Sequence, residues 1–366
     1  MFLSYLNLTN FRSYEELELE LEPGITSFVG SNGEGKTNII EAIGFLAYLR
    51  SHRTSSDNPL IKLESDKAYI RAKVNTAGRT ELLEVEINQG KANRARINQQ
   101  PVRSTRELLG HLRAVLFTPE DLALVKGDPN ERRDFLDTLL ISRTPRYAGV
   151  IADYEKALKQ RNSLLKNRPH ERDLIPWDEH LASFGAQLIA ARLQLISDLM
   201  PFVITAYRSI SEGDEISAVY KSSQDLKGIT AQDLEDEIVS LLPNLRRAEI
   251  ERGLTLIGPH RDDLVLSLGP TPVKGYASQG ESWSYALSLR MGAYSLLSRE
   301  GLGEGGEPIL ILDDVFAELD SVRRAALLAL IETSEQVFVT AAVEEDLPKK
   351  FADRRFFVRD GRVQAR

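Results

Sequence analysis

Apolar residues in the first third of the chain recur mostly at every second position, the spacing of β-strands with one buried face. Residues 16–21 alternate strictly between glutamate and leucine, so one face of this strand is acidic and exposed. Residues 68–74 and 81–87 are predicted as paired strands joined by a turn at Ala77-Gly78. Shorter apolar runs predict strands at 2–8, 26–29 and 112–117. The first third is therefore expected to be rich in β-structure.

From residue 119 onward the apolar spacing becomes helical. Helices are predicted at 130–142, 147–165, 178–211 and 231–252, with a strand at 216–220. The two long segments are joined by a polar linker, 166–176, so we expect them to pack as an antiparallel pair, with an interruption or kink near Pro201. A helix of 19 residues spans only roughly 28 Å at 1.5 Å per residue. The pair is expected to be a short projection and not a long coiled arm.

The last third returns to short buried strands, now alternating with helices. Strands are predicted at 254–257, 264–268 and 308–312, with a helix from about 278 to 298. Such alternation predicts a parallel sheet covered by helices. The expected fold class is therefore α/β, with one lobe formed by residues 1–118 and 253–366. Residues 119–252 are expected to form a mostly helical second lobe, against which the helix at 278–298 can also pack.

Composition narrows the class of protein. The 366 residues are 42% hydrophobic, enough for one large domain or two lobes, and include no cysteine, which excludes disulfides and thiolate metal sites. No apolar run is expected to reach the length needed to cross a membrane, and the first residues lack the features of an export signal. A cytoplasmic protein is expected. The net charge of −8 argues against extensive coating by nucleic acid but allows a local basic patch.

Residues 30–37, Gly-Ser-Asn-Gly-Glu-Gly-Lys-Thr, match the phosphate-binding loop G-x-x-x-x-G-K-[ST] between a predicted strand and a predicted helix. Glycines let successive backbone N–H groups turn toward an anion, and the helix N-terminus adds positive charge. Lys36 is expected to reach the β and γ phosphates, and the Thr37 hydroxyl to bind Mg²⁺. All eight residues are candidates for binding a nucleoside triphosphate: Gly30, Ser31, Asn32, Gly33, Glu34, Gly35, Lys36 and Thr37.

The second half of this predicted site follows the apolar run at 309–312, which ends in Asp313 and Asp314. Asp313 is expected to hold the water shell of the Mg²⁺ bound at Thr37. Asp314 is expected to polarise the attacking water. Together with Lys36, these two aspartates are the candidate catalytic residues. The alternative is a buried strand that merely ends in solvated acids.

Two further motifs resemble those of ABC-type ATPases. Residues 315–320 have the position and the ending, Asp320, of the D-loop, and residues 278–281, Ser-Gln-Gly-Glu, resemble a reduced signature motif. In that superfamily the signature of one subunit faces the γ-phosphate held by the other. The resemblance therefore implies nucleotide contacts by Ser278, Gly280 and Asp320. A helix cap by Ser278, with a glutamate three residues later, explains the second motif equally well.

Five sequence blocks together resemble the RecF family of recombination mediators, which are related to the head domains of SMC proteins: NFRSY near the N-terminus, PEDLALVKGDPNERRDFLD at 119–137, GPHRDD at 258–263, ASQGE, and LILDDVFAELD. The resemblance implies an ABC/SMC-head-like P-loop ATPase lobe and a homodimer that closes around ATP and Mg²⁺ with slow hydrolysis. It also implies binding to gapped, single-stranded or duplex DNA, cooperation with RecO and RecR in loading RecA, and nucleotide contact by Arg12.

The chain departs from the wider ABC pattern at three places. Asp314 stands where transporter ATPases usually carry glutamate, Thr340 takes the place of the switch histidine, and no glutamine after 112–117 provides a Q-loop. These departures favour a slow hydrolase that works as a timed clamp. Two alternatives stay open: the ATPase subunit of a membrane transporter, and a structural SMC-like head without turnover.

Basic residues concentrate in three segments that are candidates for contacting DNA phosphates. For each segment the alternative is a solvated charged face. The first cluster is Lys91, Arg94, Arg96, Arg103, Arg106 and Arg113; the second is Lys156, Lys159, Arg161, Lys166, Arg168 and Arg172; the third is Arg50, His52 and Arg53. His260 and Arg261 either sense nucleotide or DNA or pair with buried acids such as Asp262.

Overall fold

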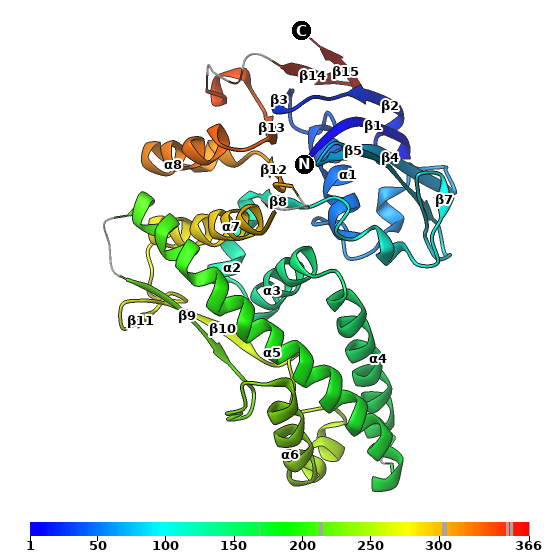
Figure 1. Cartoon of the computed structure of the whole chain (residues 1–366), viewed down its shortest axis with the longest axis vertical. Helices are drawn as coiled ribbons and strands as arrows, with labels where there is room; N and C mark the ends of the chain where they lie inside the picture. The colour runs from blue at the N-terminus through cyan, green and yellow to red at the C-terminus, as the bar shows by residue number, and fades with distance from the viewer. Residues whose placement is uncertain (168, 212–214, 302–305, 349–350, 352–353, 366) are drawn as a thin grey trace. The chain divides into compact units, whose positions relative to one another are not determined.

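The computed structural model describes every residue except 168, 212–214, 302–305, 349–350, 352–353 and 366, and its chain divides into two compact units (Figure 1). The first unit comprises Met1–Asp121, Thr205–Glu212 and Ser284–Arg366, and the second comprises Leu122–Ile204 and Gly213–Trp283. Residues 253–283 were expected in the first lobe but belong to the second unit. The reason is that β10 (Asp263–Leu268) pairs along its whole length with β9 (Ile216–Lys221).

Two six-stranded sheets form the frame of the first unit. One is antiparallel, in the order β2-β1-β4-β5-β6-β7, and the other has the order β15-β14-β3-β13-β12-β8, parallel except for β15. Strands of the antiparallel sheet are β1 (Phe2–Phe11), β2 (Tyr14–Glu20), β4 (Lys67–Thr76), β5 (Arg79–Asn88), β6 (Arg94–Ile97) and β7 (Gln100–Pro101). Strands of the mixed sheet are β3 (Gly24–Val29), β8 (Ala114–Phe117), β12 (Ile309–Leu312), β13 (Gln336–Ala341), β14 (Arg355–Arg359) and β15 (Arg362–Ala365).

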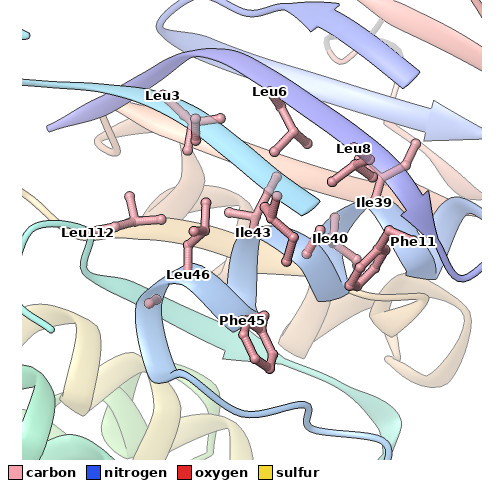
Figure 2. Packing of buried hydrophobic residues seen from close by; sticks show 14 of the residues in the cluster. Leu3, Leu6, Leu8, Phe11, Ile39, Ile40, Ile43, Phe45, Leu46 and Leu112 are labelled. Carbon is pink, nitrogen blue, oxygen red and sulfur yellow. The ribbon is translucent and has the colours of Figure 1, made fainter. Parts of the chain in front are cut away.

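Helix α1 (Lys36–Tyr48) lies in the core between these sheets. Figure 2 shows Leu3 and Leu6 of β1 facing Ile43 of α1, and the same buried cluster includes Phe28 and Phe338 of the mixed sheet. Each buried side chain of this size contributes about 1.5–3 kcal/mol relative to exposure. The start of α1, where the phosphate-binding loop ends, is therefore fixed by packing on both sides.

The first unit also contains α8 (Ser321–Glu332) and the short 3₁₀ helices η1 (Asn58–Leu60), η2 (Thr105–Leu108), η3 (Pro119–Asp121), η4 (Val315–Glu318) and η5 (Glu344–Asp346).

The second unit is mostly helical, with the small sheet β11-β10-β9. Its elements are α2 (Leu122–Lys126), α3 (Pro129–Arg143), α4 (Tyr147–Lys166), α5 (Glu171–Ile210), α6 (Ala231–Arg252) and β11 (Thr271–Pro272). Helices α5 and α7 (Gln279–Gly301) contribute residues to both units.

Helices α4 and α5 form the predicted antiparallel pair. Tyr154 packs beside Gly185, and Arg161 bonds Asp178, so positions advance along one helix as they recede along the other. The linker is shorter than expected because α5 begins at Glu171, and α5 continues as one helix through Pro201.

Two further expectations are wrong. Residues 254–257 do not form a strand, because the N–H groups of Thr255 and Leu256 bond to side chains, Asn162 Oδ1 and Glu249 Oε1. Helix α5 is also long and apolar enough to cross a membrane by length and composition alone, with a mean hydropathy of 1.5 in one 18-residue window. Its buried residues, such as Ile189, pack in the core of the second unit, which accounts for its apolar length.

Candidate nucleotide-binding site

The phosphate-binding loop connects the end of β3 to the start of α1. Gly33 and Gly35 have φ angles of 91° and 110°, which other residues rarely adopt. Position 30 requires glycine for a different reason: a Cβ there would lie 2.2 Å from the carbonyl oxygen of Val358. The sequence therefore supplies glycine where the loop turns and where it contacts β14.

Lys36 is buried inside the loop, with 3% of its surface exposed. Its Nζ donates to the carbonyl oxygens of Gly30 at 2.6 Å and Ser31 at 3.2 Å. A polar cavity of about 1000 Å³ lies beside the loop, lined by Gly30, Ser31 and Glu34 and by Arg359 and Arg362 of the C-terminal hairpin. Glu34 also accepts a hydrogen bond from the backbone N–H of Asp360.

Thr37 and the predicted carboxylates meet at the end of β12. The Thr37 hydroxyl lies 3.2 Å from Asp313 Oδ1, although the two residues are 276 positions apart in sequence. The hydroxyl of Thr340, from the neighbouring strand β13, lies 2.6 Å from the same oxygen. Thr340 also accepts a hydrogen bond from the N–H of Asp314 at 2.9 Å, and Asp314 adopts the left-handed φ of 50°.

Burial raises the pKa of Asp313 to about 6, opposed by the hydrogen bonds from Thr340 and Thr37 and reinforced by the charge of Asp314. His52 Nε2 lies 3.9 Å from Asp313 Oδ2, with the side chain 19% exposed. Burial lowers the pKa of His52. The sequence pattern placed His52 among candidate DNA contacts, so its position beside the aspartate was missed.

Arg12 is held beside α1 by Glu41. Its Nε and Nη2 lie 2.8 and 2.6 Å from the two carboxylate oxygens, and Arg53 Nη1 lies 3.3 Å from the same group. Burial alone would raise the pKa of Glu41, but hydrogen bonds from Arg12 and Ser51 and the charges of Arg12 and Arg53 lower it. Glu41 was missed because it falls inside the apolar helix that follows the loop. Asn38, one turn before it, accepts from Arg53 at 3.0 Å.

The two ABC-like motifs lie at helix starts. Ser278 and Glu281 form a reciprocal cap at the start of α7: Ser278 N–H donates to Glu281 at 2.8 Å, and Glu281 N–H donates to Ser278 at 3.2 Å. Gly280 lies within this first turn, in the second unit. Asp320 is the N-cap of α8 in the first unit and accepts from the N–H of Arg323 at 3.0 Å.

The structure removes two arginines from the basic clusters. Arg161 has a fully buried side chain that pairs with Asp178 at 2.8 Å and Glu249 at 2.5 Å, so its assignment to DNA is wrong. Arg113 is partly buried, donates to the carbonyl of Gly306, and has its pKa lowered by burial. A run of charged residues in the sequence does not show which of its side chains are buried. The candidates that the structure leaves exposed include Arg50, Lys91, Arg94, Arg96 and Lys159. Arg168 lies outside the described residues.

His260 and Asp262 are engaged with other groups of the second unit. Tyr154 and His260 Nδ1 are 2.6 Å apart, while Asp262 accepts from Tyr220 and from the N–H of Ser223, each at 2.7 Å. Arg261 is exposed. The buried Asp262 is therefore satisfied without either of the two residues considered for it.

The family model described as RecF/RecN/SMC N terminal domain matches residues 2–360. A RecF protein of Streptomyces avermitilis is 51% identical, with full coverage of both chains. The chain belongs to the RecF family. Another RecF, from Kineococcus radiotolerans, is 50% identical over 95% of this chain and 94% of its own length.

Solved structures agree with RecF membership. A structure of the recombination mediator protein RecF with ATP, in the RecFOR pathway, has a TM-score of 0.91 and 29% identity, covering 100% of this chain and 97% of the other. An SMC head bound to the C-winged helix domain of ScpA has a TM-score of 0.56 and 16% identity, covering 100% of this chain and 98% of the other. The predicted ABC/SMC-head-like P-loop fold is thus confirmed, and RecF membership argues against the transporter alternative.

Proposed function

We propose that this chain is an ATP-switched DNA-binding protein of DNA replication and recombinational repair. One observation carries the proposal: the Thr37 hydroxyl, next to the loop lysine Lys36, lies 3.2 Å from Asp313, a residue 276 positions away, and the two supply donors suited to a divalent cation beside a phosphate-binding loop. Relatives that are 51% and 50% identical carry the name DNA replication and repair protein RecF. A structural relative is the recombination mediator RecF in an ATP-bound form.

ATP is the proposed nucleotide and Mg²⁺ the proposed cation. The Thr37 hydroxyl and the Asp313 carboxylate, 3.2 Å apart, are the hard oxygen donors that Mg²⁺ prefers. When bound, Mg²⁺ would neutralise charge on the β and γ phosphates. The Lys36 ammonium, now bonded to two loop carbonyls, is the group that would exchange these partners for phosphate oxygens. Arg12, fixed by Glu41 beside α1, is the proposed further nucleotide contact.

Hydrolysis is proposed to be slow and to serve as a switch. Asp314 is the residue assigned to polarise water, and its side chain is shorter by one methylene than the glutamate of transporter ATPases. The Thr340 hydroxyl accepts a hydrogen bond from the backbone N–H of Asp314 and so fixes the backbone position from which the Asp314 side chain extends. An enzyme built in this way is expected to turn over slowly and to persist in the ATP-bound state.

The ATP-bound state is proposed to be a homodimer. Ser278 and Gly280 of one protomer would face the γ-phosphate held by the other, with Asp320 at the same interface. Their position at the N-terminus of α7 supports this role, because a helix N-terminus attracts phosphate. The partners proposed with it are gapped, single-stranded or duplex DNA, and RecO and RecR, named in the pathway of the structural relative.

Exposed basic residues are the proposed DNA contacts: Arg50, Arg53, Lys91, Arg94, Arg96 and Lys159. We also propose a cytoplasmic location, because a protein that acts on chromosomal DNA must be in the same compartment as that DNA. Phosphate contacts of this kind position a protein without reading the base sequence.

Sedimentation with and without nucleotide tests the proposal. In Mg-ATPγS the wild-type chain should become a dimer and bind a gapped duplex more tightly than in Mg-ADP. Lys36→Ala should stay monomeric under both conditions, while Lys227→Ala, which removes an exposed lysine of the second unit, should behave as wild type. A wild-type monomer whose DNA affinity ignores the nucleotide would contradict the proposal.

A further inference from the structure

A groove of about 830 Å³ lies on the outer face of the antiparallel sheet of the first unit. Strands β4 and β5 turn their apolar residues, such as Ile70 and Val85, into the core, so alternate residues face outward. The outward residues of β4, β5 and β6 line the groove, and residues 101–105 form its rim. This volume is in the range of pockets that hold small ligands or parts of a polymer.

Strand register sets the charge of the groove. Glu86 lies directly between Tyr69 and Arg94 on the neighbouring strands, and Glu84 lies between Arg71 and Arg96. We call these six outward residues, together with Arg103 on the rim, the sheet groove: Tyr69, Arg71, Glu84, Glu86, Arg94, Arg96 and Arg103. Four arginines against two glutamates leave it positively charged.

Each of the two carboxylates already pairs with one cation. Glu86 pairs with Lys67 at 2.8 Å, which lowers the pKa of the carboxyl, and Glu84 pairs with Arg71 at 3.3 Å. Arg94, Arg96 and Arg103 form no ion pair with any residue that the structure describes, and all three are exposed. Their guanidinium groups are therefore free to bind an external anion.

An aromatic ring accompanies these cations. Tyr69 is half-buried in the groove, and the guanidinium carbon of Arg71 lies 4.9 Å from the centre of its ring. Nucleobases stack on such rings, and exposed arginines along the same surface bind the phosphates of an extended strand. In a duplex each base is stacked between its neighbours, so the ring of Tyr69 cannot reach a base face.

We propose that the sheet groove binds single-stranded DNA, with a base stacked on Tyr69 and phosphates bound by Arg94, Arg96 and Arg103. The inference rests on the proposed DNA-binding function and adds to it a position and a strand preference. An acidic peptide could neutralise the arginines but would gain nothing from the ring, so the aromatic residue favours nucleic acid.

Fluorescence anisotropy with labelled oligothymidylate and a duplex of equal length tests the groove in the full chain. Tyr69→Leu should raise the Kd for the single strand about tenfold, since stacking on one aromatic side chain is worth on the order of 1–3 kcal/mol. Its Kd for the duplex should change less than about twofold. The matched control is Tyr147→Leu, because Arg146 lies 5.0 Å over that ring in the second unit, outside the groove.

A second experiment tests the proposed phosphate contacts with the double variant Arg94→Ala and Arg96→Ala. Loss of two phosphate contacts should lower the salt dependence of single-strand binding by about 1.4 in log–log slope. Arg247→Ala combined with Arg252→Ala, on the exposed surface of α6, should leave the slope unchanged. Photo-crosslinking of iodouracil-substituted strands should label Tyr69 directly.

Three outcomes would overturn the inference while leaving the proposed function intact: wild-type single-strand affinity in the groove variants, an equal loss for duplex, or displacement of the strand by polyglutamate with Tyr69→Leu unaffected. A wild-type chain that bound no DNA at all would instead remove the proposed function. The circular dichroism spectrum and unfolding midpoint of each variant show that it is folded.

Discussion

The hydroxyl of Thr340 lies 2.6 Å from Oδ1 of Asp313, at the carboxyl ends of two neighbouring parallel strands. The same hydroxyl accepts a hydrogen bond from the N–H of Asp314. One side chain thus stabilises both residues of the carboxylate pair, the first through its charge and the second through its backbone. The sequence pattern predicts Thr340 at the place of the switch histidine of ABC-type ATPases, and its two contacts favour a positioning role.

Replacing Thr340 with valine keeps the side-chain volume and removes the hydroxyl. The pKa of Asp313 should rise above its value of about 6, because a hydrogen bond that lowers it is lost. The acid side of the ATPase pH profile should therefore move to higher pH, and turnover should fall. Thr340→Ser, which keeps the hydroxyl, should restore the wild-type profile. An unchanged profile in Thr340→Val would remove the positioning role.

Lys36→Ala and Asp314→Asn should separate binding from hydrolysis. Lys36→Ala should abolish ATP binding, because the buried ammonium is the central cation of the loop. Asp314→Asn should bind ATP and dimerise but fail to hydrolyse it. Equilibrium binding of a fluorescent ATP analogue and phosphate release measure the two steps. Normal turnover in Asp314→Asn would show that another group activates the water.

Arg161→Met tests the buried ion pairs of the second unit. Without the guanidinium, the fully buried carboxylate of Glu249 loses its partner, so unfolding should become easier by about 3–5 kcal/mol. Lys159→Ala, two positions earlier and exposed, should change stability by less than about 0.5 kcal/mol. Urea unfolding of both variants decides the point. Wild-type stability in Arg161→Met would mean that the chain reorganises around Glu249.

His260 should make the second unit sensitive to acid. Burial lowers its pKa to about 4, with the backbone contact to Thr255 opposing this and the charges of Arg261, Arg133 and Arg161 adding to it. The His260 imidazole is protonated near pH 6.5 in the unfolded chain but only near pH 4 in the folded chain. Stability contributed by the neutral ring is thus complete above pH 6.5 and falls as the pH drops, by at most roughly 3 kcal/mol.

Unfolding in urea at a series of pH values measures this effect. His260→Asn keeps a polar atom near the Tyr154 hydroxyl and cannot be protonated, so its stability should depend less on pH between 6.5 and 4. An identical pH dependence in the wild type and the variant would assign the acid sensitivity to other groups.

The sequence predicts those parts of the site that are formed by consecutive residues. The loop at 30–37 needs glycines, a lysine and a threonine at fixed spacing, and the strand at 309–312 needs only apolar residues before its acids. Both were identified because each is a property of one short segment. The meeting of Thr37 with Asp313 followed from the fold class, since parallel strands place their carboxyl ends together.

Other features depend on segments that sequence spacing does not connect. Arg161 looked like a surface cation because its neighbours in sequence are charged, but it is buried through partners on α5 and α6. His52 lies beside Asp313, although it belongs to an irregular segment after α1 whose position the sequence pattern does not predict. Residues 254–257 have the composition of a strand, yet their N–H groups bond to side chains of α4 and α6.

The place of β3 in its sheet has a consequence for synthesis on the ribosome. β3 carries the phosphate-binding loop and lies between β13 and β14, which are made only when residues 336–359 emerge. Gln336 also bonds the backbone of Leu3 through both its amide oxygen and its nitrogen. A nascent chain therefore holds its nucleotide loop on a strand without neighbours until translation is almost finished. ATP is therefore expected to bind only chains in which β13 and β14 have already paired with β3.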